Sequence, residues 1–135
     1  GQEGDVAMRI SKIDHVVMTT DVVDECLKFY RMLGFSIRDA QGRYELTAGD
    51  VRINLYRRGD GVYPHADNMQ PGSTDLCFEL DGNIDELRML RDYFEKQGLD
   101  VSDSLVPRNG LRGAMQSFYL RDPDGNSIEI SSYGG

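Results

Sequence analysis

The sequence predicts an α+β fold of two βαβββ modules whose strands form a curled mixed-sheet cleft. Two observations support this prediction. The order strand, helix, hairpin occurs twice along the 135 residues, and a glycine suited to ending a helix, Gly34 or Gly98, follows each helical stretch. The expected divisions are a disordered leader at 1–9, one domain at 10–135, modules at about 10–58 and 73–133, and a linker at 59–72.

The first module is expected to begin with a β-branched, apolar strand at 10–20. In the stretch that follows, Asp21 is placed to cap a helix, apolar side chains keep helical spacing, and Gly34 ends it. The remaining strands of this module are expected near 36–40 and in a hairpin at 43–57 that turns at Ala48-Gly49.

The second module repeats this order. Apolar side chains keep helical spacing from Ile84 to Phe94, and Gly98 closes the helix. The elements of this module are expected as a strand at 73–80, a helix at 83–99, a short strand near 100–106 and a hairpin at 115–133.

The turn sequence DPDGN determines the register of the last hairpin. A three-residue loop with Gly125 in the left-handed bulge position makes Asp122 face Asn126, and counting outward sets Tyr119 opposite Glu129. A slip by one residue would mix polar and apolar side chains on both faces. The Glu129 carboxylate is therefore expected about 5 Å from a phenol, a pair suited to holding a metal or orienting a substrate.

Alternation splits most strands into an apolar and a polar face, and the polar faces are expected on one side of the sheet. Ordinary solvent exposure explains such a face, and a polar cleft between two curled half-sheets is the alternative. The first strand favours the cleft, because Ile13, His15 and Val17 share one face of a strand whose two faces are both largely apolar. The histidine there is either structural or a ligand.

Composition restricts the class of function. A net charge of -8 and a pI near 4.6 argue against nucleic acid and anionic membranes as partners, since both require a basic face. No stretch approaches the roughly 20 apolar residues of a membrane span. Cys26 and Cys77 lack metal-type spacing and are expected as buried free thiols, which indicates a reducing compartment, by default the cytoplasm.

Three motifs carry a resemblance to a known family: IDHVVMTTDVVDECLKFYRMLGF, PGSTDLCFEL and FYLRDPDGNSIEI. They resemble the vicinal oxygen chelate superfamily, which includes glyoxalase I, bleomycin-resistance proteins and ring-cleaving dioxygenases, over nearly the whole chain. VPRNGLRG, residues 106–113, is similar to small glyoxalase-domain members of that family. The resemblance implies a homodimer and, as in metal-using members, one divalent ion held in the cleft.

The resemblance also implies a set of metal ligands, His15, Asp75 and Glu129. Asp75 stands where many members carry histidine, and Asn54 stands where glyoxalase I carries glutamate. One imidazole and two carboxylates suit Zn²⁺, Mn²⁺, Fe²⁺, Ni²⁺ or Co²⁺. Because Asn54 cannot take a proton, we expect it to bind substrate, and we do not expect efficient methylglyoxal–glutathione isomerisation.

Five further side chains are candidates for roles in the cleft. Tyr119 is expected to be a catalytic or substrate-binding partner of the metal site. His65 is a candidate base, gate or spare ligand, or else a surface residue. Arg108 and Arg112 either bind an anionic substrate at the rim or support their own loop. Cys77 is expected to pack rather than to act as a nucleophile, because no basic neighbour is evident to lower its pKa.

The leading functional hypothesis is a metal-dependent lyase, isomerase or dioxygenase acting on a small, oxygen-rich substrate. Its first rival is a metal-free protein of the bleomycin-resistance type that sequesters a cationic drug, which a net charge of -8 suits. The second rival is a thiol transferase resembling fosfomycin-resistance enzymes. All three hypotheses make a small molecule the binding partner.

Overall fold

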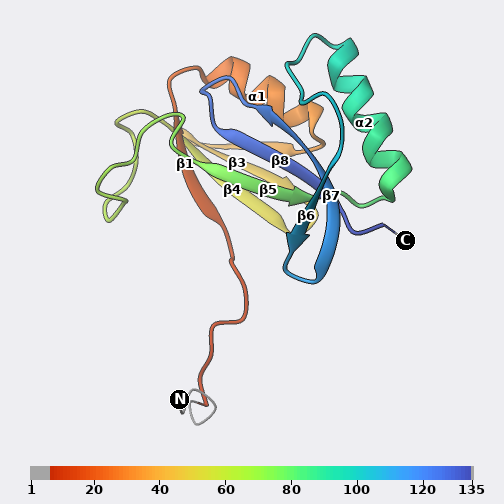
Figure 1. Ribbon diagram of the computed structural model, residues 1–135. Helices are drawn as coiled ribbons and strands as arrows, with labels where there is room; N and C mark the ends of the chain where they lie inside the picture. Colours follow the sequence, from red (N-terminus) through yellow and green to blue (C-terminus); the bar gives the residue numbers. More distant parts are fainter. Residues whose placement is uncertain (1–6, 135) are drawn as a thin grey trace.

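The computed structural model describes residues 7–134, which form two helices and eight strands in two sheets (Figure 1). The first half of the chain contains β1 (Val16–Thr20), α1 (Val23–Met32), β2 (Ser36–Ala40), β3 (Arg43–Ala48) and β4 (Val51–Arg57). The second half contains β5 (Asp75–Glu79), α2 (Ile84–Lys96), β6 (Val106–Gly110), β7 (Gly113–Arg121) and β8 (Ser127–Ser132). Most of the leader expected at 1–9 lies outside the described residues.

The two sheets share one topology. Their strand orders are β1-β4-β3-β2 and β5-β8-β7-β6, with the first strand of each half parallel to the last. The register repeats as well, because Val17 lies opposite Asn54 in the first sheet as Cys77 lies opposite Glu129 in the second. The predicted α+β fold of two βαβββ modules is therefore confirmed, as two separate mixed sheets that do not close on one another.

One hydrophobic core extends through both modules. Tyr30, Phe94 and Phe118 have no exposed surface, and burying an aromatic ring of this kind stabilises the fold by about 1.5–3 kcal/mol. The Phe35 ring, just after α1, meets Phe78 of β5 edge-on with 5.5 Å between ring centroids. The two modules are thus packed together through a shared core.

The start of α1 differs from the prediction. Asp21 does not cap the helix; the N-cap residue is Val22, without a side-chain cap, and its backbone N–H donates to the Thr20 hydroxyl at 3.0 Å. The Asp21 carboxylate accepts instead from Arg58, at 2.8 and 2.6 Å. Gly34 ends the helix as expected, at a φ of 97°.

The second helix has a complete capping box. The Asn83 side chain accepts from the Glu86 backbone N–H at 2.9 Å, and the Glu86 carboxylate accepts from the Asn83 N–H at 3.0 Å. Gly98 follows the helix at a φ of 87°. Asp85 and Glu86 in the first turn also lie at the positive end of the helix dipole, which stabilises this end further.

Two expected strands have different bounds in the structure. Residues 10–15 are not a strand, because the pairing with β4 begins only at Val16, opposite Ile53; the segment before β1 extends away from the body of the chain (Figure 1). The strand expected at 100–106 is β6, which begins at Val106 and pairs with the first half of β7. VPRNGLRG therefore forms β6, the turn and the first residue of β7, and is not a loop.

The predicted register of the last hairpin is confirmed. Tyr119 lies opposite Glu129, and Phe118 lies opposite Ile130. At the turn, the Asp122 N–H donates to the Asn126 carbonyl at 3.1 Å, and Gly125 adopts a φ of 93°. The hairpin at the end of the first module is confirmed too, but Ala48 pairs with Val51, so its turn is Gly49-Asp50, one residue later than expected.

The two cysteines differ in environment. Cys26 is buried as expected, but Cys77 is exposed, because it lies on the polar face of the edge strand β5. The expectation that both thiols are buried is therefore wrong for Cys77. Within residues 7–134, neither helix has the length and apolar character needed to cross a bilayer.

Candidate functional site

A cavity of about 590 Å³ opens on the polar face of the first sheet. Strand residues form one wall of it, and the loop that contains Tyr63 and His65 forms another. His15, just before β1, and Asn54, on β4, both line the sheet wall. The polar face of this half is therefore a cleft, and both histidines of the chain lie in it.

The two histidines have different hydrogen-bond partners. His15 shares a hydrogen bond between Nδ1 and the Asp14 carboxylate at 2.8 Å, and its side chain is 40% exposed. That contact fixes the ring and leaves Nε2 for another partner. It also holds the pKa of Asp14 below its ordinary value. The His65 Nδ1 lies 2.9 Å from the Ala66 carbonyl oxygen, and its ring contacts Tyr63 at 6.0 Å between centroids.

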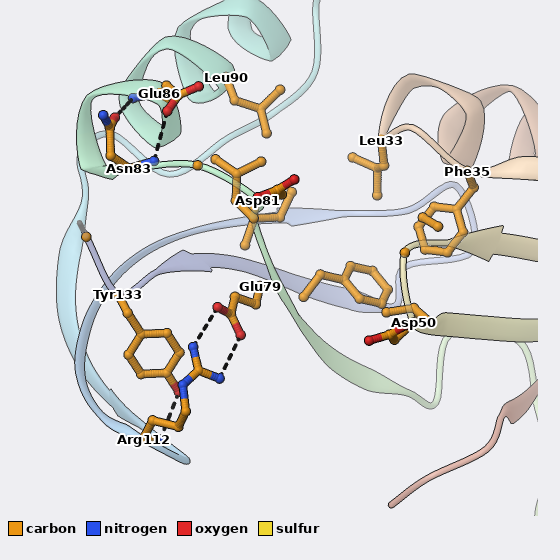
Figure 2. A pocket seen from close by; sticks show the side chains of 18 residues that line it. Leu33, Phe35, Asp50, Glu79, Asp81, Asn83, Glu86, Leu90, Arg112 and Tyr133 are labelled. Carbon is orange, nitrogen blue, oxygen red and sulfur yellow. Dashed lines mark hydrogen bonds and ion pairs between the residues drawn. The ribbon is translucent and has the colours of Figure 1, made fainter.

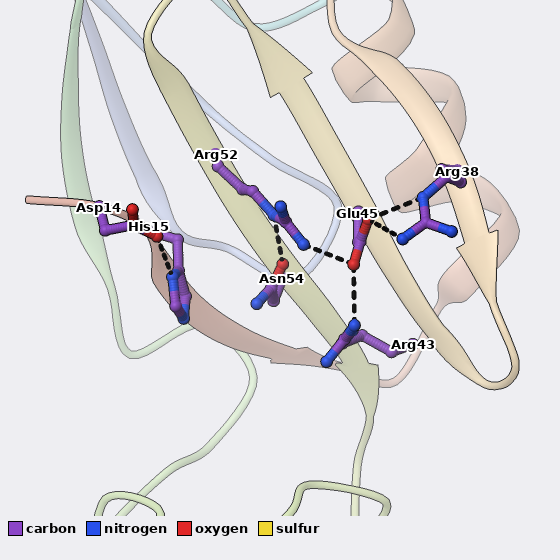
Figure 3. A network of polar contacts seen from close by, with 7 residues as sticks. All are labelled: Asp14, His15, Arg38, Arg43, Glu45, Arg52 and Asn54. Atoms are coloured by element: carbon purple, nitrogen blue, oxygen red, sulfur yellow. Dashed lines mark hydrogen bonds and ion pairs between the residues drawn. The ribbon is translucent and has the colours of Figure 1, made fainter.

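A buried carboxylate next to the cavity binds three arginines (Figure 3). Glu45, on β3, is only 6% exposed and contacts Arg38 at 2.6 Å, Arg43 at 2.8 Å, and Arg52. Burial tends to raise the pKa of Glu45, but the three guanidinium groups outweigh it and hold the pKa below its ordinary value. The Arg52 Nε also donates to the side-chain Oδ1 of Asn54 at 3.1 Å, which leaves the side-chain Nδ2 of Asn54 as a donor.

The polar face of the second sheet centres on Glu129. Its Oε2 accepts from the Ser117 hydroxyl at 2.7 Å and from the Ser131 hydroxyl at 3.3 Å. Across the strand pair, the Tyr119 hydroxyl accepts from the Arg108 Nε at 2.8 Å, and the guanidinium lies 5.5 Å from the ring centroid. The structure thus brings Arg108 and Tyr119 to the strand pair that carries Glu129.

Asp75 and Cys77 lie exposed on the neighbouring strand β5. The Cys77 thiol shares a 3.2 Å hydrogen bond with the Ser131 hydroxyl. Partial burial, followed by the nearby carboxylates Glu129 and Glu79, raises the pKa of Cys77. A thiol with a raised pKa is a poor nucleophile, which agrees with the expectation that Cys77 is not a nucleophile, whereas its exposure contradicts the packing role expected from the sequence.

Arg112 lies in a different place from Arg108. Its guanidinium forms a bidentate pair with Glu79, at 3.1 and 2.7 Å, and lies 4.2 Å from the Tyr133 ring centroid (Figure 2). These three side chains line a second cavity, of about 840 Å³, between the end of β5 and the β3–β4 turn. The two rim arginines predicted from the sequence therefore do not serve one site within a single chain.

The three predicted metal ligands do not form a cluster within one chain. Among the described residues, the only three His, Cys, Asp or Glu side chains with ligand atoms within 4.8 Å of one another are Cys26, Asp122 and Asp124. Burial raises the pKa of the Cys26 thiol to about 12, so the thiol keeps its proton. Both Asp122 oxygens already accept hydrogen bonds from the chain, and we interpret this group as structural.

The arginine cluster beside the cavity was not predicted from the sequence. Its signal was available in the 43–57 hairpin, where Arg43 and Glu45, and then Arg52 and Asn54, alternate on one face. The turn at Gly49-Asp50 places Glu45 opposite Asn54, whereas a turn at Ala48-Gly49 would have paired Glu45 with Arg52. The contribution of Arg38 required the β2–β3 register as well.

Comparisons with known proteins agree on one family. A sequence model of the Glyoxalase/Bleomycin resistance protein/Dioxygenase superfamily matches residues 12–130. The glyoxalase domain-containing protein RDO1 of Mycosarcoma maydis is 38% identical over 127 residues, covering 93% of this chain and 70% of that protein. The virulence protein STM3117 of Salmonella typhimurium is 37% identical over 130 residues, covering 95% of this chain and 88% of that protein. A solved structure from the mobile metagenome of V. Pseudocholerae, 39% identical, matches with a TM-score of 0.86 and covers 96% of this chain and 100% of that chain.

Proposed function

Because the chain belongs to the glyoxalase/bleomycin resistance protein/dioxygenase superfamily, we propose that it is a metal-dependent enzyme acting on a small, oxygen-rich substrate. The reaction is of the lyase, isomerase or dioxygenase type. The proposed metal ligands are His15, Asp75 and Glu129. The observation that supports this function best is the hydrogen bond between His15 and Asp14, which leaves one ring nitrogen for a ligand beside a cavity of about 590 Å³.

The donor groups fit a divalent transition metal ion. One imidazole and two carboxylates form the nitrogen and oxygen set that suits Zn²⁺, Mn²⁺, Fe²⁺, Ni²⁺ or Co²⁺. The Glu129 carboxylate is oriented by two serine hydroxyls that bind its Oε2, so Oε1 is left to bind an ion. A divalent ion at this site would polarise a substrate carbonyl and stabilise the negative charge that develops on its oxygen.

We place the complete metal site between two copies of the chain. His15 precedes β1 and lies in a cavity of the first half, whereas Asp75 and Glu129 belong to the second sheet. Both β1 and β5 are edge strands with one side unpaired in their sheets, and such edges favour pairing with another chain. A symmetric homodimer that joins β1 of one copy to β5 of the other would bring the three ligands together twice.

The remaining polar side chains are proposed to bind and orient the substrate. The Arg108 Nε donates to the Tyr119 oxygen, so the Tyr119 proton is free to be donated to a substrate oxygen. The Asn54 amide nitrogen is a second donor, held in place by Arg52. His65 is the proposed proton acceptor, because it lines the same cavity as His15. The Asn54 side chain cannot take a proton and is therefore not a candidate for this role.

The test is metal binding by purified protein loaded with Ni²⁺, Mn²⁺ or Zn²⁺. About one ion per chain is expected, and His15→Ala or Glu129→Ala should each remove it. Glu79→Gln is the matched control, because Glu79 is an exposed carboxylate of β5 paired with Arg112 and is not a proposed ligand. Full metal content in the His15 or Glu129 variant, or well under one ion in the unchanged protein, contradicts the proposal.

A further inference from the structure

We propose that Arg43 and Arg52 form an oxyanion subsite in the His15 cavity and that the substrate carries a carboxylate, phosphonate or phosphate group there. This inference rests on the proposed function, because it names the substrate class of the same site. It adds a requirement that neither the donor set of the metal site nor membership of the superfamily imposes.

The two arginines are placed for such a role by the hairpin of β3 and β4. Arg43 and Arg52 line the cavity together with His15 and Asn54, and their side chains are 38% and 39% exposed. Each gives one Nη2 to the buried Glu45, which fixes the guanidinium groups in position (Figure 3). Arginines held in this way are preorganised to bind an anion.

The arginines are not saturated by the chain. A guanidinium group offers five N–H donors, and the bonds to Glu45 and Asn54 use only part of those of Arg52. The Arg43 guanidinium is bound by the Tyr56 side chain and by Glu45, which raises the pKa of Arg43, and its Nε is buried, so Arg52 supplies most of the unused donors that face the cavity. An oxyanion entering the cavity would therefore find donors that the protein itself does not use.

The local charge has the sign that an oxyanion requires. Three guanidinium groups against the single Glu45 carboxylate leave two positive charges in a chain whose net charge is -8. Asp14, which also lines the cavity, contributes one negative charge, and its carboxylate is hydrogen-bonded to His15. A cationic drug would meet repulsion here, which favours the enzymatic function over the drug-binding rival.

The alternative role for these arginines is purely structural, as counterions of a buried glutamate. Arg38 separates the two roles within this chain. It contacts Glu45 at 2.6 Å as closely as the others do, yet its side chain is 70% exposed and it is absent from the described residues that line the cavity. Losing Arg38 should disturb Glu45 without removing a donor from the subsite.

The experiment is calorimetric titration of EDTA-treated protein with inorganic phosphate, methylphosphonate and oxalate at low chloride. At least one of these should bind in a saturable manner. Arg43→Gln and Arg52→Gln should each weaken it by about 10-fold or more, the effect of losing a charge-assisted contact. Arg38→Gln should weaken it by less than about 3-fold, and Arg52→Lys, which keeps a charge beside Glu45, should give an intermediate loss.

Three results would overturn the inference: no saturable binding of any probe up to about 10 mM, equal weakening by Arg38→Gln and Arg52→Gln, or unchanged affinity in Arg52→Gln. Circular dichroism checks that each variant is folded. If a glutamine variant unfolds, Arg52→Lys decides, with undiminished affinity counting against the subsite. Metal is absent from the titration, so arginine-dependent binding in a protein that fails to hold metal would refute the proposed function and leave the subsite standing.

Discussion

Replacing Tyr30 by phenylalanine should remove the hydrogen bond that ties α1 to the turn of the second module. The Tyr30 hydroxyl has no exposed surface around it and donates to the Asp122 Oδ2 at 2.8 Å; Asp122 is 4% exposed. Burial, and then the Asp122 charge, raise the pKa of Tyr30 well above its ordinary value, so the phenol remains a donor at any ordinary pH.

The magnitude follows from the number of bonds that remain. Asp122 also accepts from the Asn126 side chain at 2.8 Å and from the backbone N–H groups of Asp124 and Asn126, at 3.0 and 2.9 Å. A hydrogen bond to a charged group contributes about 1.5–3 kcal/mol, and three surviving donors place the loss near the lower value. The free energy of unfolding should fall by about 1.5–2 kcal/mol in Tyr30→Phe.

Urea unfolding followed by circular dichroism measures this loss at constant m-value. Tyr93→Phe serves as the control, because Tyr93 is 49% exposed on α2 and its variant should differ by less than about 0.5 kcal/mol. A loss below about 0.5 kcal/mol in Tyr30→Phe would show that the hydroxyl contributes nothing across the two modules, and the reasoning would be wrong.

Three further predictions concern stability. Gly72→Ala should lower the free energy of unfolding by about 2 kcal/mol or more, since its Cβ would lie 2.4 Å from the Asp124 carbonyl oxygen at a φ of +80°. Gly59→Ala is the control and should lower it by about 1 kcal/mol, because Gly59 has a φ of +87° but open space around it. Equal losses in chemical denaturation would contradict the close approach at Gly72. Asn83→Ala should lower the free energy of unfolding by about 1 kcal/mol through loss of the capping box, and an unchanged urea midpoint would disprove that role. The Cys26 pKa is raised from 9.0 to about 12, so its contribution is complete below pH 9 and is lost as the pH rises towards 12, at up to about 1.4 kcal/mol per pH unit. Unfolding of Cys26→Ala should therefore depend less steeply on pH above 9 than that of the unchanged protein, and parallel profiles would refute the buried thiol.

The fold was predictable because its signals are local. The turn DPDGN determined a register that pairs Tyr119 with Glu129, and alternation then separated the buried from the polar face. Gly34 and Gly98 correctly predicted where the helix of each half ends. These features depend on a few neighbouring residues, so they were read correctly from the chain.

The ends of the strands were harder to predict, because a strand extends only as far as it is paired with a neighbouring strand. Residues 10–15 were expected in the same strand as the apolar, β-branched residues that follow them, but the pairing with β4 begins only at Val16, opposite Ile53. The segment 100–106 looks extended, yet the pairing begins at Val106, opposite Ser117. Composition carries no information on where a partner strand begins or ends.

The site was predictable only in part, because it too depends on contacts between distant parts of the chain. Alternation placed Glu129 on a polar face and singled out His15 as a polar residue on a largely apolar strand, and the structure shows each of them oriented by a neighbouring side chain. How the two sheets lie relative to one another is a tertiary property that alternation does not encode. The convergence of the predicted ligands therefore stays a prediction, and we propose that it occurs at the contact between two copies.

Mixing two inactive variants tests the shared metal site most directly. His15→Ala chains and Glu129→Ala chains each lack one ligand, and neither should bind metal alone. If the site joins ligands from two copies, random reassembly makes half of the dimers mixed, each with one intact site, so roughly a quarter of the sites should bind metal again. If all ligands came from one chain, every site in the mixture would be defective and metal content would stay at zero, which would contradict the shared site.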